Sequence, residues 1–381
     1  MEKLFALIEE LSPAYVQFWK EICEIETPSH DKAAVDMLAD KLEAHAKAIG
    51  CEVYREAFEK AGDCLRVDLP GDESRQPIVM MAHMDTVHEK GAFGPETVIL
   101  KDGILYGPGV NDCKNGITMS MLLLEAFQKS GYPHPPIRVL YTSDEEISAR
   151  LSGRQGIEFF EKQAAGAKVV LNCESGTVGK LVVGRKGIGN VELQITGKAA
   201  HAGGSYFDGA SAVREAAHKI LAIEALSQRG GNTFNCGIVH GGTRPNIVPE
   251  SCSVQIDIRS LEVEGMNAAI EQVRQIAEHT YVEGTACTMT IGSIRPPMEA
   301  NEANYALIAR INELAAELGM APMTPVVSGG GSDAAYTTRM GIPTVCSIGP
   351  CGWDVHTIRE RSDIATLPVR AKLVAKCICE L

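Results

Sequence analysis

Short apolar runs without polar alternation recur along the first half of the chain. Strands that are buried on both faces give this pattern, whereas a strand with one wet face alternates between apolar and polar positions. A strongly apolar stretch with helical spacing, residues 117–127, separates the first two runs. The strands predicted from these runs are 78–82, 137–141 and 167–171. Their alternation with helices predicts an α/β fold with a mostly parallel sheet flanked by helices.

Two helices are expected within the first 50 residues. Ser12-Pro13 is typical of an N-cap followed by the first helical residue, and Ser29 is expected to cap the second helix. Apolar side chains recur at helical spacing from Ala33 to Leu42. Gly50 is expected to end this helix.

The order of elements changes after about residue 186. Strand and helix signals then follow as strand, helix, strand, strand, helix, strand, which fits a ferredoxin-like α+β sandwich. The expected strands are 191–196, 232–240, 251–259 and 286–291, and the expected helices are 210–226 and 266–282. Arg295-Pro296-Pro297 is expected to lead back to the first domain, with a helix near 305–318 and a strand near 344–348. We therefore expect one domain formed by residues 1–186 and 296–381, with residues 187–295 as an inserted domain.

Charge and cysteine content narrow the class of protein. The 381 residues include 36 Lys and Arg against 49 Asp and Glu, a formal net charge of −13. Nucleic acids and anionic membranes require a basic face, so we expect neither as a partner. The N-terminus lacks the basic flank and apolar centre of a signal peptide, and no apolar run reaches the ~18 residues of a membrane span. The 12 cysteines include no C-x-x-C pair, which favours reduced, buried thiols in a cytoplasmic protein.

Three consecutive predicted strands are followed by histidine or acidic residues. A further aspartate lies in one glycine-rich loop, and a further histidine follows another. Ligands bind beyond the carboxyl ends of strands in an open α/β sheet, so we expect these side chains to converge on one crevice. Imidazoles with several carboxylates form a donor set suited to zinc, manganese or cobalt. One carboxylate could bridge two cations and another could act as a base. The side chains are His83, Asp112, Glu145, Glu146, Glu174 and His356.

Each of these groups also has an ordinary structural explanation. A single histidine is usually a hydrogen-bonded polar residue, and paired glutamates usually lie on a solvated surface. Carboxylates at strand ends often cap the next helix. The joint occurrence of all six side chains at strand ends and glycine-rich loops favours a metal site over these explanations.

These residues resemble the motifs of the co-catalytic dizinc metallopeptidases. The resemblance covers essentially the whole chain, including the inserted domain. The family includes glutamate carboxypeptidases, aminoacylases, several deacylases and dipeptidases. It implies two Zn²⁺ ions, with Co²⁺ or Mn²⁺ as alternatives, and an inserted lid domain through which two copies form a homodimer. The matching motifs are His83-x-Asp85, Gly109-x-x-Asp112-x-Lys114, Asp144-Glu145-Glu146, Glu174 and His356.

The resemblance assigns Asp112 as the ligand that bridges the two metals. The remaining ligands it implies are His83 and Glu174 for one metal, and Glu146 and His356 for the other. Asp85 would orient His83 by a hydrogen bond. Glu145 would be the general base and then the general acid. His201 of the lid would stabilise the oxyanion in the active site of the partner subunit.

Substrate contacts are also implied by the resemblance. The loop from Ser328 to Tyr336 is similar to the glycine-rich loop of glutamate carboxypeptidases, whose backbone N–H groups can hold a carboxylate. Arg295 matches the position of the family's carboxylate-binding arginine. For Arg259, a structural ion pair is an equally good explanation. The candidate substrate-binding residues are Arg295, Asn246, Gly330, Gly331, Ser332, Arg259 and Lys180.

Two positions differ from the family pattern. Cys113 stands where a second acid often follows the bridging aspartate, at a peptide bond that is commonly cis in the family. Val182 stands where a serine that binds glutamate would be expected. The first difference leaves the metal ligand intact, and the second weakens the assignment of glutamate in particular.

The sequence therefore predicts a zinc-dependent hydrolase that cleaves an amide bond next to a free α-carboxylate, similar to a glutamate carboxypeptidase. An N-acyl amino acid deacylase or a dipeptidase is the alternative within the same family. The expected substrates are small peptides or N-acyl amino acids. A catalytically idle scaffold is disfavoured because all five metal ligands and Glu145 are present.

Overall fold

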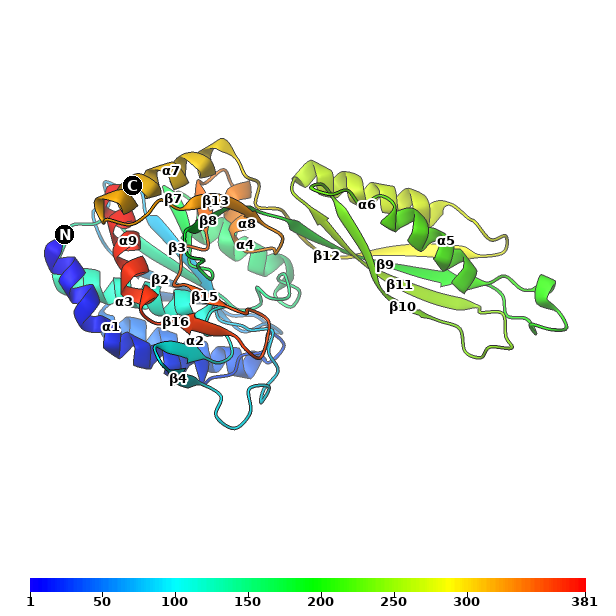
Figure 1. Ribbon diagram of the computed structural model, residues 1–381, viewed down its shortest axis with the longest axis horizontal. Coiled ribbons are helices and arrows are strands. Elements are labelled where there is room, and N and C mark those ends of the chain that lie inside the picture. Colours follow the sequence, from blue (N-terminus) through cyan, green and yellow to red (C-terminus); the bar gives the residue numbers. More distant parts are fainter. The chain divides into compact units, whose positions relative to one another are not determined.

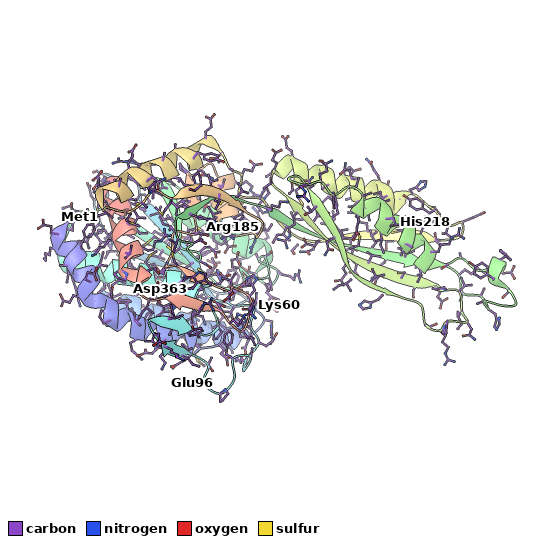
Figure 2. All side chains as sticks on the ribbon, in the orientation of Figure 1. Met1, Lys60, Glu96, Arg185, His218 and Asp363 are labelled. Carbon is purple, nitrogen blue, oxygen red and sulfur yellow. The ribbon has the colours of Figure 1, made fainter.

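The computed structural model describes residues 1–381, which divide into two compact units (Figure 1). The first unit comprises Met1–Gly184, Ala300–Val327 and Ser332–Leu381. The second comprises Arg185–Glu299 and Ser328–Gly331. Side chains surround both units (Figure 2), with Glu96 and Asp363 in the first and His218 in the second.

An eight-stranded sheet forms the centre of the first unit, in the order β1-β2-β6-β3-β7-β14-β8-β13. Strands β6, β3, β7 and β14 are parallel to one another, whereas β1 pairs antiparallel with β2, β2 with β6, and β8 with β14. The predicted α/β class with a mostly parallel sheet is confirmed. The strands are β1 (Glu52–Glu56), β2 (Cys64–Leu69), β3 (Ile78–His83), β6 (Ile137–Thr142), β7 (Val169–Asn172), β8 (Lys180–Arg185), β13 (Thr324–Ser328) and β14 (Thr344–Cys346).

Helices cover both faces of this sheet, which explains the continuous apolar runs. Successive residues of a strand point to opposite faces. In β3, Met80 and Ala82 pack into the larger core, whereas Val79 and Met81 pack on the other face against Phe159. The helices of the larger core are α1 (Glu2–Cys23), α2 (Lys32–Ile49), α3 (Lys114–Ser130), α7 (Glu302–Glu317) and α9 (Thr366–Glu380), and those of the other face are α4 (Gly153–Gln163) and α8 (Ala334–Arg339).

Two expected helix starts are wrong. Helix α1 begins at Glu2 and continues through Pro13, because Leu4 and Ile8 before the proline are fully buried and belong to the core. Helix α2 is capped by Asp31, whose side chain accepts a hydrogen bond from the backbone N–H of Ala34 at 3.0 Å. Ser29, the expected cap, contributes to the functional site instead.

A small antiparallel sheet in the first unit joins two distant loops. It has the order β15-β16-β5-β4, and β16 pairs with β5. Because β5 precedes the loop of Asp112 and His356 lies between β15 and β16, this pairing brings the two glycine-rich loops together. The strands are β4 (Ile99–Lys101), β5 (Ile104–Tyr106), β15 (Gly352–Trp353) and β16 (Arg361–Asp363).

The second unit has the predicted order of strands and helices. Its sheet, β10-β11-β9-β12, is antiparallel throughout. Helices α5 and α6 pack on one face through a core that includes Leu193, Ala216 and Val273. The elements are β9 (Gly187–Thr196), η1 (Tyr206–Asp208), α5 (Ala212–Glu224), β10 (Thr233–Gly241), β11 (Ser251–Ser260), α6 (Val263–Glu278) and β12 (Ala286–Arg295). None of the helices in either unit combines the length and apolar character that a membrane span requires.

Candidate metal centre

Neighbouring parallel strands position the acidic and histidine side chains at one edge of the large sheet. His83 is the last residue of β3 and pairs in register with Thr142, the last residue of β6. Glu145 and Glu146 follow β6, and Glu174 follows β7 on the other side of β3. Three adjacent strands therefore deliver these side chains to the same end of the sheet, where ligands of α/β proteins bind.

Asp112 lies between two imidazoles. Its Oδ1 is 3.0 Å from Nε2 of His83, and its Oδ2 is 3.2 Å from Nε2 of His356. The same nitrogen of His356 is 3.2 Å from Oε2 of Glu146. The peptide bond from Asp112 to Cys113 is cis. One carboxylate thus faces a histidine with each oxygen, which is the arrangement that a ligand shared by two cations needs.

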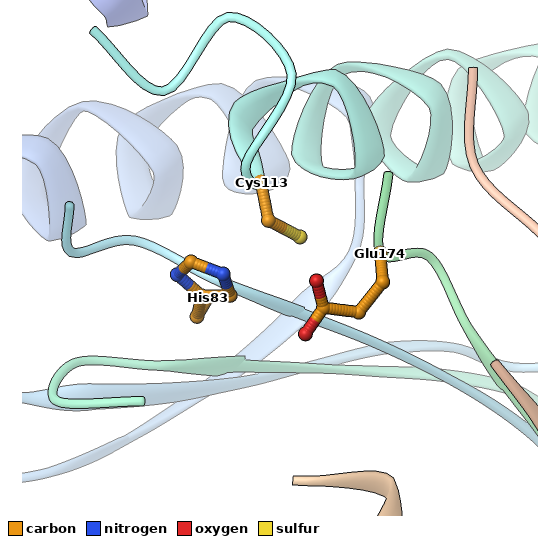
Figure 3. Close-up of side chains that lie close together, drawn as sticks. All are labelled: His83, Cys113 and Glu174. Atoms are coloured by element: carbon orange, nitrogen blue, oxygen red, sulfur yellow. The ribbon is translucent and has the colours of Figure 1, made fainter. Parts of the chain in front are cut away.

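Glu174 follows β7, the neighbour of the strand that ends at His83. Its Oε1 accepts a hydrogen bond from the hydroxyl of Ser332 at 3.1 Å, and that hydroxyl accepts one from the Asn172 amide at 2.8 Å. One ligand atom each from His83, Cys113 and Glu174 lie within 4.8 Å of one another (Figure 3). Glu145 and Glu174 line one small pocket beside His83.

A buried carboxyl oxygen without a hydrogen-bond partner indicates that these residues fit a cation. Oε1 of Glu146 is buried and has no hydrogen-bond partner, although Oε2 of the same carboxylate lies beside His356. Burying a carboxyl oxygen without a hydrogen-bond partner is costly. His83, Asp112 and Glu146 also offer ligand atoms within 4.8 Å of one another. A divalent cation would satisfy the oxygen, and the nitrogen and oxygen donors present suit zinc, cobalt or manganese.

Asp85 connects His83 to both glutamates. Its carboxylate accepts hydrogen bonds from the backbone N–H groups of Glu145 and Glu146, each at 3.1 Å. The hydroxyl of Ser29 donates to the same carboxylate at 2.6 Å. Nδ1 of His83 lies 3.0 Å from the backbone oxygen of Asp85, which leaves Nε2 directed at Asp112. Asp85 therefore orients the loop after β6 as well as the imidazole.

Burial and neighbouring charges shift the pKa values of Asp112, Glu146 and His356. Hydrogen bonds to Asp112 and Glu146 raise the pKa of His356 to about 11. Burial raises the pKa of Glu146 to about 8, and the negative charge of Asp112 adds to this rise. Burial also opposes the ionisation of Asp112, but hydrogen bonds from His356 and His83 hold its pKa well below its usual range. A cation that binds here must displace the proton of His356, so its affinity rises with pH.

Glu360, which the sequence did not identify, links the two glycine-rich loops. It is 1% exposed and follows His356 in the loop between β15 and β16. Its Oε1 accepts hydrogen bonds from the backbone N–H groups of Asn111 at 2.8 Å and Asp112 at 2.9 Å. Its Oε2 is 2.8 Å from Nε2 of His88. The spacing of residues in the sequence does not predict hydrogen bonds to backbone atoms of a distant loop, so only the structure could reveal them.

Replacing Glu360 with glutamine should weaken zinc binding about 10- to 100-fold, the usual effect of losing a residue that supports metal ligands. The backbone N–H groups of Asn111 and Asp112 now donate to a charged carboxylate. A glutamine amide has one uncharged oxygen to accept them, so the backbone at Asp112 is held less firmly. Competition with a chromogenic chelator measures the affinity, and Glu302→Gln on α7 is the exposed control. Unchanged zinc affinity in a folded Glu360→Gln protein would show that this carboxylate does not position Asp112.

In the second unit, the structure brings His201 and Asn246 together. Residue 201 forms an isolated β-bridge with Ile247, and the N–H of Ala202 donates to the backbone oxygen of Asn246 at 3.0 Å. Nδ1 of His201 accepts hydrogen bonds from the N–H groups of Gly203 and Gly204 at 3.2 and 3.1 Å. Both predicted lid residues are exposed. The bonds to Nδ1 leave Nε2 as the imidazole nitrogen available to donate.

The other predicted substrate contacts have different surroundings. Arg295 ends β12 and is 3% exposed, and a Cβ added at Gly331 would lie 3.1 Å from its Cδ. Nη1 of Arg185 donates to the backbone oxygens of Gly331 at 3.0 Å and Gly330 at 3.5 Å. The predicted glycine loop therefore packs against Arg295 and is held by a second arginine that the sequence did not identify.

Arg259 pairs with a neighbouring aspartate, and Lys180 lies on the surface of the first unit. The guanidinium of Arg259 binds both carboxylate oxygens of Asp257, at 2.7 and 3.1 Å. The structural ion pair considered for Arg259 is therefore present. Lys180 is exposed at the first position of β8. Ser332, in contrast, is 1% exposed and contacts Glu174 in the first unit.

Comparisons with known proteins agree with this architecture. Carboxypeptidase G2 from Pseudomonas sp. (strain RS-16) is 29% identical over 389 residues, covering 99% of this chain and 92% of that protein. Succinyl-diaminopimelate desuccinylase from Stenotrophomonas maltophilia (strain K279a) is 27% identical over 317 residues, covering 76% of this chain and 81% of that protein. The solved structure of a tripeptidase from Staphylococcus aureus subsp. aureus mu50 has a TM-score of 0.81 at 25% identity, covering 96% of this chain and 97% of that one.

A family model matches most of the chain. The match to the model of peptidase family M20/M25/M40 covers residues 79–380, which include every candidate metal ligand. It extends through the second unit and both later segments of the first. The chain therefore belongs to peptidase family M20/M25/M40 and is a metallopeptidase.

Proposed function

We propose that the protein is a two-metal amidohydrolase that cleaves an amide bond next to a free α-carboxylate. The observation that carries this proposal is the position of Asp112, whose two oxygens lie 3.0 and 3.2 Å from the imidazoles of His83 and His356. The proposed ligands are His83, Asp112 and Glu174 for one cation and Asp112, Glu146 and His356 for the other.

Two divalent cations bound here, zinc or alternatively cobalt or manganese, would lower the pKa of a water molecule and polarise the scissile carbonyl. Glu145 is the proposed proton carrier. It is 7% exposed and lines the pocket beside His83, whereas its neighbour Glu146 turns to His356. Glu145 accepts a proton from the attacking water and donates it to the leaving amine, so the proton balance closes within one turnover.

The second unit would supply the groups that stabilise the oxyanion and contact the substrate. As the family resemblance implies, His201 donates a hydrogen bond to the oxyanion in the active site of the partner subunit of a homodimer, and Asn246 contacts the substrate. The exposure of both residues and the two hydrogen bonds to Nδ1 of His201 support this assignment. A dimer also explains why an exposed histidine would be held in one fixed turn.

The proposed reaction is similar to that of a glutamate carboxypeptidase, with glutamate-terminated compounds as substrates. The similarity to carboxypeptidase G2 and the packing of Gly331 against Arg295 support recognition of a carboxylate by Arg295 and the loop from Gly330 to Ser332. Arg259 and Lys180 are weaker candidates for the same role, since Arg259 already binds Asp257. An N-acyl amino acid deacylase or a dipeptidase is the second candidate, favoured by the buried Val182 where a serine would bind glutamate.

A mass-spectrometric screen tests the proposal. Zinc-loaded wild-type protein is incubated with pooled glutamate-terminated peptides, N-acyl amino acids and dipeptides, and Glu145→Gln protein is the blank. Wild type alone should release an amino acid with a free α-carboxylate, with glutamate as the expected product. Release of other amino acids from N-acyl compounds or dipeptides would favour the second candidate. No release by a wild-type protein that binds two cations would contradict the proposed substrate classes.

A further inference from the structure

Cys113 directs a sulfur atom at the metal centre, in addition to the five expected ligands. It immediately precedes α3 and is fully buried. Its side chain points towards His83 and Glu174 (Figure 3), and the ligand atoms of the three residues lie within 4.8 Å of one another. The sulfur therefore lies beside the two side chains proposed to share a cation with Asp112.

The other contacts of this thiol are weak hydrogen bonds. Sγ of Cys113 lies 3.7 Å from the backbone oxygen of Cys173 and is also within hydrogen-bonding reach of the backbone N–H of His83, but sulfur is a weak donor and a weak acceptor. The two other groups that face it, His83 and Glu174, are the cation ligands proposed above. A small apolar side chain would fill the space equally well. The sulfur is thus held beside the cation site without a strong partner of its own.

We propose that Sγ of Cys113 is a soft donor to the cation held between His83, Asp112 and Glu174, and that it makes this site favour zinc over manganese. The proposal rests on the two-metal function proposed above. Thiolate ligands select zinc among the divalent cations that nitrogen and oxygen donors also bind, whereas carboxylates suit manganese. Binding forms one sulfur–cation bond and releases the thiol proton to solvent.

The required movement is small. Zinc bonds of about 2.0–2.3 Å place neighbouring donors about 3–3.5 Å apart, so atoms that lie within 4.8 Å of one another would draw together by about 1 Å. A five-coordinate zinc would hold these ligands and still bind the water that the proposed function requires.

Cobalt provides a direct test because a bound thiolate gives an intense near-ultraviolet charge-transfer band. Metal-free full-length wild type and Cys113→Ser are titrated with Co²⁺, and bound cobalt is counted after dialysis. Cys377→Ser, in the fully buried part of α9, is the matched control. The band should grow with cobalt in wild type and in the control, and should be absent from Cys113→Ser while the weaker visible bands of cobalt persist.

Affinities for two metals provide the second readout. Cys113→Ser should lose about tenfold or more in zinc affinity and much less in manganese affinity, because a thiolate favours zinc and a hydroxyl oxygen does not. Cys113→Asp should bind both cations without the band and shift its preference towards manganese, and it replaces Cys113→Ser if that variant fails to fold.

The outcomes separate this proposal from the proposed function. Wild type that binds two cobalt ions without the near-ultraviolet band would overturn the role of Cys113 and leave the two-metal site standing. Persistence of the band in Cys113→Ser, or equal losses of zinc and manganese affinity, would overturn it as well. Wild type that binds no cobalt would instead contradict the metal site itself.

Discussion

Glu145→Gln should lower kcat by about 10²–10⁴-fold and leave the cation content of the protein unchanged. Glutamine cannot accept the proton of the attacking water, but it preserves the size of a side chain that is 7% exposed. The backbone N–H of residue 145 still donates to Asp85, so the loop after β6 keeps its position. Steady-state kinetics on the substrate found in the screen, together with elemental analysis of the same sample, measures both quantities.

The adjacent glutamate is the matched control for this variant. Glu146→Gln changes the same residue type one position later, but it removes a proposed ligand that lies 3.2 Å from His356. It should lower the cation content as well as the turnover. Near-normal turnover by Glu145→Gln with both cations bound would show that another group accepts the proton.

Asp112→Asn should abolish stable binding of both cations, because Asp112 is the only proposed ligand that both sites share. An amide also leaves the imidazoles of His83 and His356 without the carboxylate that lies 3.0 and 3.2 Å from them. Equilibrium dialysis against zinc should fall from two cations per chain to fewer than one, and turnover should fall with it.

Asp144→Asn is the control for the loss of a buried aspartate in the same region. Its carboxylate accepts hydrogen bonds from Ser152 and from the backbone N–H of Leu151, which an amide oxygen can partly replace. This variant should keep both cations. Two zinc ions bound by Asp112→Asn with wild-type affinity would contradict a bridging role for Asp112.

The sheet could be predicted because burial on both faces leaves a strong trace in sequence. In β3, side chains that alternate between the two cores are all apolar, so residues 78–82 form an unbroken run. Helix starts were less predictable. Ser12-Pro13 has the local features of an N-cap, yet the buried Leu4 and Ile8 extend α1 to Glu2. Tertiary packing overrode a local preference there.

Some residues of the candidate site could be predicted from the sequence and others could not. His83 and the glutamates after β6 and β7 could be anticipated because chemistry gathers at the carboxyl ends of parallel strands. Supporting groups such as Ser29, Glu360 and Arg185 could not. They act through a hydroxyl on Asp85 or through bonds to backbone atoms of distant loops, and such contacts depend on tertiary positions that no spacing in the sequence encodes.

Diffraction from zinc-loaded crystals, recorded on both sides of the zinc absorption edge, tests the central claim most directly. The claim is that two cations share Asp112. The anomalous map should show two peaks about 3.5–4 Å apart, one beside His83 and Glu174 and the other beside Glu146 and His356, with Asp112 between them. A single peak, or zinc bound away from Asp112, would contradict the two-metal mechanism.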